Sequence, residues 1–361
     1  MSPLRRERKC QTMPITTSRL TLLAALLAAT TGFLAQAAAP AWAAAAQVRA
    51  QAPGFYRMML GDFEITALLD GTHPFPAAAV LNKAKAGPSG GRLNLFDHDP
   101  DEANALLAAS DLTAPTEGSI NAFLVNTGTK LILIDSGAGT LYGACCGHLI
   151  ENLRASGYRP EQIDEVLLTH LHADHVGGIA PGGIAAFPNA VIRSSKLDGD
   201  YWLNDANEKA AQDFLRPMFE GDKASLKPYI ATGRYMPLEG EQEIVPGIRA
   251  VPLPGHTPGH TSYAVESRGQ KLLVWGDVVH VAAIQFPDPS VTVKYDSDED
   301  QAETDRKRIF SDAAKAGYWI GAAHISFPGL GHVGVRSGAF IWLPGDYTTR
   351  MSVDPVTGQP K

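Results

Sequence analysis

Residues 169–178 read Thr169-His170-Leu171-His172-Ala173-Asp174-His175-Val176-Gly177-Gly178 and follow directly after an apolar run. Imidazole nitrogens and a carboxylate are ligands that suit a borderline divalent ion such as zinc. His170 and His172 alternate, so their side chains share one face of an extended segment. Asp174 and His175 are neighbours whose side chains diverge, and a second ion is the simplest way to use both. We therefore predict a two-metal site on a loop at the end of a strand.

Three further candidate ligands also follow apolar runs. His256 comes after a run that ends near Leu253, Asp277 follows Trp275-Gly276, and His324 follows Ala322-Ala323. One such histidine alone is more often a hydrogen-bonded core or loop residue. Four polar loops at four strand ends are hard to explain by chance, and the buried edge of a sheet would present them to one cleft. The sequence therefore predicts that these loops share a metal centre.

The composition is that of a globular protein with a sizeable core. The chain has 361 residues, of which 45% are hydrophobic and 19% charged, and its formal net charge is −7. Residues 1–46 hold five basic residues and one acidic residue, so the rest has 26 basic and 37 acidic residues and a net charge of −11. No basic stripe appears, which argues against nucleic acid as a partner. The negative charge also argues against strongly anionic substrates, unless metals reverse the local field.

The first residues have the pattern of a secretory signal peptide. A basic region over 5–19 precedes the apolar stretch 20–39, and small residues at 41–43 offer a cleavage site. A membrane anchor is the alternative, because the apolar stretch is long. We expect residues 1–46 to be removed and the protein to be periplasmic or secreted, with no stable membrane anchor after processing. Residues 47–361 are then expected to form one domain.

Apolar alternation and turn residues outline the secondary structure. We expect 47–60 to be a flexible lead-in, Asp70-Gly71 to turn the first strand, and 72–100 to be an excursion outside the core. The expected strands are 63–69, 120–126, 130–135, 163–169, 190–193, 243–251, 262–266, 271–275 and 318–324, and the expected helices are 101–109, 141–156, 198–231 and 300–317. Runs of strands followed by a helix occur twice, which predicts an α/β (α+β) protein with two β-rich halves covered outside by helices.

Other motifs in the chain carry weaker signals. Residues 87–91 match the Gly-x-Ser-x-Gly pattern of serine hydrolases around Ser89, but no strand precedes the motif and no helix follows it. Cys145 and Cys146 are neighbours, so buried small side chains are their favoured role. The acidic run 296–300 lacks the glycine and glutamate spacing of a calcium loop and is interpreted as a helix start or a solvated face. His73 is expected on the surface.

The complete order of ligands points to a family. The motif His170-x-His172-x-Asp174-His175, with His256, Asp277 and His324 after it, resembles the metallo-β-lactamase superfamily. The resemblance implies an αβ/βα sandwich, in which two mixed sheets pack face to face with helices outside. It also implies two divalent metal ions, with zinc as the default and manganese, cobalt or iron as alternatives. On the family pattern, one ion is bound by His170, His172 and His256, the other by Asp174, His175 and His324, and Asp277 bridges the two.

Three segments narrow the resemblance within the superfamily. Residues 122–128, 259–263 and 322–329 are similar to methyl parathion hydrolases and related secreted lactonases, whereas class B β-lactamases lack the full ligand set. This branch implies aromatic side chains around an apolar leaving group. The matching positions are Tyr142, Trp202 and Phe219, and packing in the core is the alternative for each.

The ligand set predicts hydrolysis of an ester. A hydroxide shared by two ions would attack the carbonyl of a lactone or of an aryl or alkyl ester with an apolar substituent. Asp277 is expected to hold both ions and Asp174 to orient the hydroxide. His280, three residues after Asp277, is expected to donate a hydrogen bond to a developing oxyanion or leaving oxygen, with a structural histidine as the alternative. Tyr295 is expected to line the same substrate-binding wall and to crowd a bulky phosphotriester.

Two other activities stay open on the sequence. The first is hydrolysis of an organophosphate triester of the methyl parathion type. The second and more remote is a non-hydrolytic metal oxidoreductase on the same fold, although the altered histidine cluster and flavin domain of such enzymes are not seen. In each case the expected partner is a small apolar molecule. The resemblance also implies that residues 72–100 contact a second copy of the chain in a homodimer.

Overall fold

The computed structural model describes residues 45–84 and 91–351. By its internal contacts the chain divides into Met1–Gln51 and Ala52–Lys361, and all the elements below belong to the second unit. The predicted signal peptide over 1–46 and the serine motif around Ser89 fall almost wholly outside the described residues and stay predictions. In the described part of the chain, no helix has the length and apolar character needed to cross a membrane.

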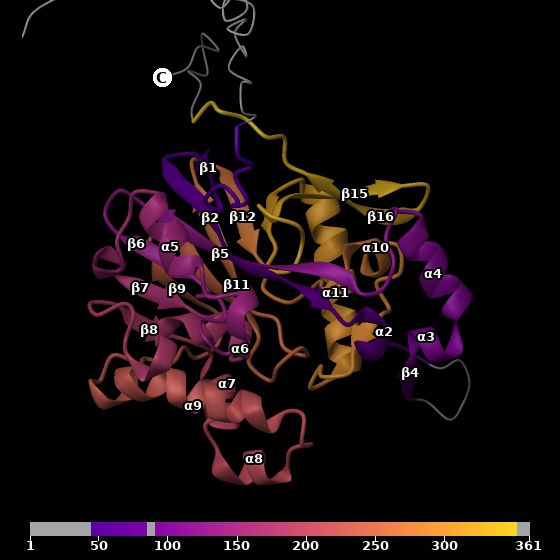
Figure 1. Cartoon of the computed structure of the whole chain (residues 1–361), viewed down its shortest axis with the longest axis horizontal. Helices are drawn as coiled ribbons and strands as arrows, with labels where there is room; N and C mark the ends of the chain where they lie inside the picture. Colours follow the sequence, from indigo (N-terminus) through magenta and orange to yellow (C-terminus); the bar gives the residue numbers. More distant parts are fainter. Residues whose placement is uncertain (1–44, 85–90, 352–361) are drawn as a thin grey trace, which may run out of the picture. The chain divides into compact units, whose positions relative to one another are not determined.

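The first sheet is mixed and comes from the first half of the chain (Figure 1). Antiparallel pairing joins the first four of its strands, and parallel pairing joins the last three. In spatial order, its strands are β1 (Phe55–Leu60), β2 (Phe63–Phe75), β5 (Thr116–Asn126), β6 (Leu131–Ile134), β7 (Glu165–Leu167) and β8 (Val191–Arg193).

The second sheet is also mixed and comes from the second half of the chain. Its one parallel pair is β12 with β14. In spatial order, its strands are β16 (Ala339–Pro344), β15 (Leu330–Arg336), β14 (Trp319–Gly321), β12 (Gln270–Val274), β11 (Thr261–Ser267), β10 (Ile248–Pro252) and β9 (Gln242–Val245). A small sheet beside these two consists of β13 (Thr292–Val293), β3 (Leu81–Ala84) and β4 (Arg92–Asn94).

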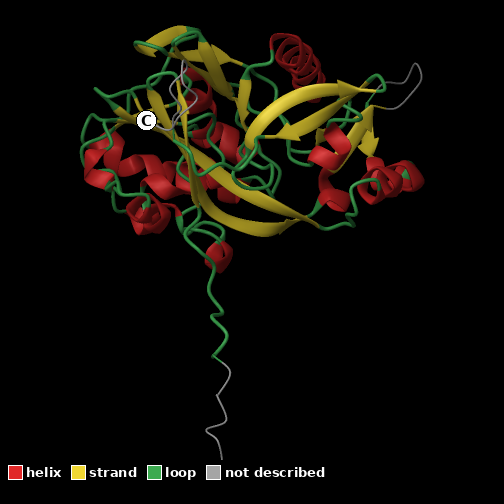
Figure 2. Ribbon diagram, turned by 90° about the horizontal axis from the view of Figure 1, so that it is seen from above, coloured by secondary structure: helices red, strands yellow, loops and turns green. Residues whose placement is uncertain are grey.

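Helices cover the outer faces of both large sheets, as Figure 2 shows from above. On the first sheet the cover includes α5 (Leu149–Ala155) and α9 (Arg216–Ala231), and on the second it is α11 (Glu299–Ala316). The shorter helices are α2 (Ala77–Val80), α3 (Leu95–His98), α4 (Pro100–Ala108), α6 (Ala173–Val176), α7 (Lys196–Trp202), α8 (Asp205–Ala210) and α10 (Ala282–Gln285), with 3-10 turns at Gly143–Cys145, Pro160–Gln162, Gly177–Ile179 and Pro181–Gly183.

Side chains along the central strands point alternately to the core between the two sheets and to the helices outside. In β5, Phe123 and Val125 face the core between the two sheets, whereas Leu124 faces the helices outside. In β12, Val274 faces the core between the sheets and Leu273 faces α11. Strands buried on both faces need apolar side chains in both directions, which is why these segments appear in the sequence as nearly unbroken apolar runs. The predicted αβ/βα sandwich is confirmed.

Both ends of the described chain hold more strand than the sequence predicted. Phe55–Leu60 is not a flexible lead-in, because it pairs with β2 along its length. The chain does not turn at Asp70, since β2 continues to Phe75 across a register shift between Leu69 and Gly71. The strand predicted at 318–324 is not the last one, because β15 and β16 extend the second sheet.

Two predicted elements are interrupted by glycines with positive φ. Residues 243–251 form two strands rather than one, because Gly247, with φ of 86°, lies in the turn between β9 and β10. The helix predicted over 141–156 begins only at Leu149, since Gly147 has φ of 89°. The region 72–100 is not wholly an excursion either, because it completes β2 and supplies β3 and β4.

Candidate metal centre

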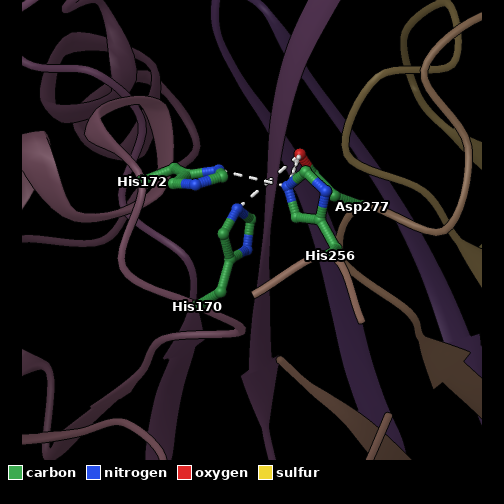
Figure 3. Close-up of side chains that lie close together, drawn as sticks. All are labelled: His170, His172, His256 and Asp277. Atoms are coloured by element: carbon green, nitrogen blue, oxygen red, sulfur yellow. Dashed lines mark hydrogen bonds and ion pairs between the residues drawn. The ribbon is translucent and has the colours of Figure 1, made fainter. Parts of the chain in front are cut away.

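The candidate ligands come from both sheets and meet between them. His170 and His172 follow β7, and Asp174 and His175 lie on the single turn α6 directly after them. His256, Asp277 and His324 follow β10, β12 and β14, one from each strand. Figure 3 shows His170 and His172 pointing from one side toward His256 and Asp277 on the other. The loops from the two sheets therefore face one another as the sequence predicted.

The side chains fall into two main groups that could each hold an ion. The first is His170, His172, His256 and Asp277, and the second is Asp174, His175 and His324; all seven are buried, and within each group the ligand atoms lie within 4.8 Å of one another. Asp277 lies between the groups: its Oδ1 is 3.1 Å from His175 Nε2, and its Oδ2 is 3.1 Å from His324 Nε2 and 3.3 Å from His256 Nε2.

Buried polar atoms without partners show that this donor set fits divalent metal ions. Within the described residues, His170 Nε2, His175 Nε2 and Asp277 Oδ1 are buried and have no hydrogen-bond partner. A buried polar atom without a partner is costly, so an arrangement that gathers several of them needs a compensating ligand. Imidazole nitrogens and carboxylate oxygens in this number suit zinc or a similar ion.

Asp135 organises the half of the centre that comes from the first sheet. Its carboxylate accepts hydrogen bonds from the backbone N–H and the hydroxyl of Thr169 at 2.8 and 2.9 Å, and Oδ2 lies 2.9 Å from His175 Nδ1. The Thr169 hydroxyl in turn lies 3.0 Å from His170 Nδ1. A Cβ at Gly178 would collide with the Ser136 carbonyl, so only glycine allows the loop to lie this close to β6.

Separate oxygens orient the histidines of the other half. Asp296 Oδ1 lies 2.6 Å from His256 Nδ1, and the Ser119 carbonyl lies 2.9 Å from His324 Nδ1. An oxygen acceptor at Nδ1 places the proton there and leaves the Nε2 lone pair directed at the centre, which is how outer partners prepare metal-binding histidines. His260 Nε2 accepts a hydrogen bond from the Asp277 backbone N–H at 3.0 Å, while its Nδ1 lies 2.9 Å from the Leu253 carbonyl.

Burial and nearby charge set the protonation of the cluster. Burial lowers the pKa of His170 and His172 well below the usual value, which favours the neutral imidazole that a metal requires. At Asp277 burial opposes the charged form, but the surrounding histidines, His175 first among them, outweigh it and lower the pKa well below its usual value. Burial also lowers the pKa of His280 to about 4, so this imidazole is neutral near pH 7.

The predicted substrate-binding aromatics occupy different positions. The Tyr142 hydroxyl donates to Asp174 Oδ1 at 3.2 Å, and the residue is 36% exposed. Tyr295 makes edge contacts with the rings of His172, His256 and His280, at centroid distances of 5.8 to 6.1 Å. Trp202 is buried and makes an edge contact with His172 at 5.1 Å. Phe219 is fully buried behind Trp202 in the outer core, so this structure gives it a packing contact and no place on the wall of the centre.

His280 faces the same space as the ligands. Its Nε2 lies 3.1 Å from Asp277 Oδ2, and its ring stacks on His324 at 5.2 Å and on Phe75 at 5.8 Å. Together with Asp277 and His324 it forms a third group whose atoms lie within ligand distance of one another. A cavity of about 350 Å³ opens beside this imidazole. Its lining includes His280, Ala283, His324, Ile325, Phe327 and Trp342.

The sequence did not reveal several residues that support the centre. Asp135 and Phe75 were given no role, although both directly end or follow a strand of the first sheet. Asp296 was placed in a solvated acidic run, but its side chain is buried against His256. Asp298, in the same run, accepts a hydrogen bond from the Gln301 backbone and does begin α11 as predicted. His73 is half-buried with its ring against Tyr142 at 5.8 Å, so it reaches the surface only in part.

A family model now accounts for most of this arrangement. The model of the metallo-beta-lactamase superfamily matches residues 115–318, which hold every candidate ligand except His324. The chain belongs to the metallo-β-lactamase superfamily. The crystal structure of AbOPH, a hydrolase in the beta lactamase superfamily, agrees, with 36% identity and a TM-score of 0.74 over 83% of this chain and 100% of that one.

Two lactonases are also similar to this superfamily member. AidC, described as a dizinc quorum-quenching lactonase in complex with a product, is 27% identical, with a TM-score of 0.70 over 82% of this chain and 99% of that one. An N-acyl homoserine lactonase of Bacillus cereus is 28% identical over 126 residues, which are 35% of this chain and 42% of the lactonase. The chain thus spans less than half the length of that relative.

Proposed function

We propose that this protein is a metal-dependent hydrolase of lactones and carboxylic esters that carry an apolar substituent, in the branch of secreted lactonases and methyl parathion hydrolases. One observation carries the proposal. Two buried donor groups meet at Asp277, and an open cavity lies directly beside them at His280. The similarity to AidC and to the Bacillus cereus lactonase supports the choice of lactones.

The donor groups indicate which residues would hold the metals. His170, His172 and His256 would hold one ion, and Asp174, His175 and His324 the second, with Asp277 between them. Bound ions of this kind supply a Lewis acid for the substrate oxygen and lower the pKa of water enough to make it a nucleophile near neutral pH. Zinc is our choice of metal, because the set is dominated by imidazoles.

The chain's own residues orient the reaction. The Tyr142 hydroxyl holds Asp174 at Oδ1, and the His260 imidazole holds the Asp277 backbone. His280 is neutral, so it offers one N–H donor and can stabilise negative charge that develops on a substrate oxygen. Asp277 Oδ2 lies 3.1 Å from His280 Nε2, so this edge of the ring lies at the centre.

The cavity beside His280 is the place for the apolar substituent. Its lining includes the imidazoles of His280 and His324, and Ile325, Phe327 and Trp342 form part of the apolar lining. A chain or ring buried there would contribute about 0.8 kcal/mol per methylene. Tyr295 packs against His172, His256 and His280, and we propose that its ring crowds a bulky phosphotriester at the centre.

A substrate panel tests the proposal. The zinc-loaded protein is assayed by kcat/KM with an aryl lactone, an N-acyl homoserine lactone, an aryl ester and methyl parathion. We expect the lactones and the aryl ester to be hydrolysed well above methyl parathion. A clear preference for methyl parathion would establish the phosphotriesterase alternative, and no hydrolysis of any of the four would reject an esterase.

A variant that fills the cavity tests where the substituent lies. Ala283 lines the cavity, and Ala283→Trp should raise KM about tenfold for a long-chain ester, equivalent to about 1.4 kcal/mol, while a methyl ester is hardly affected. Ala231→Trp, at the exposed end of α9, is the matched control. Equal losses for the long and the short ester would place the substituent elsewhere.

We also propose that residues 1–46 export the protein to the periplasm or beyond the cell. The basic, apolar and small-residue regions of this segment support the proposal. Amino-terminal sequencing of the protein from its native host should give a chain that starts near residue 47. A chain that keeps its first residues and fractionates with the cytoplasm would contradict it.

A further inference from the structure

The loop between β6 and α5 carries two neighbouring thiols that the proposed reaction does not use. Cys145 and Cys146 are both free, and their Sγ atoms lie 2.8 Å apart. Cys146 is buried, but Cys145 is only half-buried, so the pair is not the fully buried filler expected from the sequence. The accessible thiol can attack a disulfide from solution, and the second thiol lies close enough to attack the mixed disulfide that forms.

We propose that Cys145 and Cys146 form a reversible disulfide that changes the position of Tyr142 at the candidate metal centre. The co-reactant is a low-molecular-weight disulfide such as oxidised glutathione. Cys145 attacks it as the thiolate, forms a mixed disulfide and releases one thiol. Cys146 then attacks the Cys145 sulfur and releases the second thiol, so the two cysteines are oxidised, the co-reactant is reduced, and the two cysteine protons end on the released thiols.

The bond between neighbours is reversible because it is strained. Consecutive Cα atoms are about 3.8 Å apart across a trans peptide. Ordinary disulfides join Cα atoms roughly 4.4–6.8 Å apart. Strained disulfides have higher reduction potentials and are the ones that cells reduce again. Oxidation must therefore displace the backbone next to the two cysteines.

Hydrogen bonds to Asp70 hold the backbone that follows the two cysteines and leads into α5. The Asp70 carboxylate accepts hydrogen bonds from the backbone N–H groups of Ala138, Gly147 and Leu149, at 2.9, 3.0 and 3.1 Å. Gly71 lies directly beneath the peptide that joins the cysteines, because a Cβ there would be 2.7 Å from Cys146 Cα. The peptide between Cys145 and Cys146 therefore cannot move toward β2 or toward α5. When the disulfide forms, the backbone must move on the other side of the pair, which is the side of Tyr142.

Tyr142 connects this displacement to the metal centre. The Cys145 thiol lies 3.4 Å from the Tyr142 carbonyl, and only Gly143 and Ala144 separate the two residues. Gly143 has φ of 74° with open space around its Cα, so it can change conformation at little cost. The Tyr142 hydroxyl donates to Asp174, a candidate ligand, and oxidation should lengthen or break that hydrogen bond. This last step rests on the proposed function.

Mass spectrometry tests the bond without any assay of activity. The full-length, metal-loaded protein is equilibrated in glutathione buffers from fully reduced to fully oxidised, alkylated and digested. We expect the peptide with both cysteines to take two alkyl groups when reduced and, when oxidised, to take none and lose the mass of two hydrogens. Two alkyl groups in every buffer, or a stable glutathione adduct on Cys145, would overturn the proposal.

Hydrolysis assays test the link to Tyr142. We expect oxidation to lower kcat/KM about tenfold, as the loss of one hydrogen bond to a charged group implies. Cys145→Ser and Cys146→Ser should each abolish this response, and Tyr142→Phe should abolish it although the disulfide still forms. Ala108→Ser, at an exposed position of α4 outside this loop, should respond as the wild type does.

The possible failures can be told apart. A disulfide that forms with no change in rate would overturn the coupling to Tyr142. Absence of hydrolysis in the reduced wild type would be a failure of the proposed function, and the mass measurement would still decide whether the bond forms. If one serine variant does not fold, the other still gives the answer.

Discussion

The two halves of the candidate metal centre are built in different ways. The first sheet supplies four ligands from one short loop and α6, and one carboxylate, Asp135, contacts both Thr169 and His175 there. The second sheet supplies His256, Asp277 and His324 from three separate strands, and a different oxygen or imidazole supports each of them. Loss of Asp135 should therefore disturb several ligands of the first half together. Loss of one support in the second half should disturb only the ligand that it contacts.

Asp277 is the exception within the second half, because it belongs to both donor groups. Asp277→Ala should lower kcat/KM by more than the roughly 100-fold that loss of an outer partner costs a metal site, and it should reduce the bound metal to at most one ion per chain. Metal analysis and kinetics on the same preparation check both effects. Asp200→Ala, on the exposed part of α7, is the control. Full activity with one ion per chain would show that no second ion takes part.

The outer carboxylates test the difference between the halves directly. Asp135→Asn should weaken metal affinity about 100-fold, since it disturbs the whole loop, whereas Asp296→Asn should weaken it about 10-fold, since it disturbs His256 alone. Competition with a chelator measures both. Each variant is the control for the other, because both remove one buried charge beside one histidine. Equal losses would mean that the first-sheet loop does not depend on a single support.

The same difference explains what the sequence could reveal. The ligands of the first half stand together in His170–His175, so their spacing alone predicted a metal site and its place after a strand. His256, Asp277 and His324 could be singled out as polar residues after apolar runs, but only the family resemblance assigned them to particular ions. The apolar runs themselves predicted the layered fold, because strands buried on both faces have no other explanation.

The parts that the sequence missed depend on contacts between distant segments. Asp296 is 40 residues from His256 and looks like one charge among several until the fold buries it against that ring. β1 was missed because its pairing with β2, not its own pattern, decides its structure. The exposure of Cys145 likewise depends on how the loop lies against Gly71.

His280 tests a smaller contribution from the second half. His280→Ala should lower kcat about tenfold, the value of one hydrogen bond to developing charge, with two metal ions still bound. Kinetics and metal content are compared with those of His332→Ala, since His332 packs against Trp319 on the second sheet and does not line the cavity. If His280→Ala loses an ion, His280 is a ligand in the third group with Asp277 and His324 rather than a donor to substrate.

The smallest expected effect is on protein stability. It concerns α9, the helix that covers the outer face of the first sheet. Asp222 on α9 is fully buried, and neither carboxylate oxygen has a hydrogen-bond partner in the described part of the chain. Burial, with the charges of Asp198 and Asp174, raises its pKa well above the usual value. The folded state thus binds a proton that the unfolded state releases. Its stability then falls as pH rises, by about 1.4 kcal/mol per unit between the unfolded value and the folded pKa.

Asp222→Asn replaces the titrating carboxyl group with an amide of nearly the same shape, so a polar side chain stays buried at this position. The Tm of the variant should exceed that of the wild type by an amount that grows as pH rises from the unfolded pKa toward the folded pKa, while kcat/KM stays unchanged at neutral pH. Asp213→Asn, an exposed carboxylate just before the same helix, should show no such growth. A difference in Tm that does not change with pH would mean that Asp222 stays charged in the folded protein. A buried charge of this kind needs a polar partner, which would then lie beside α9. The first half would then have a second support besides Asp135.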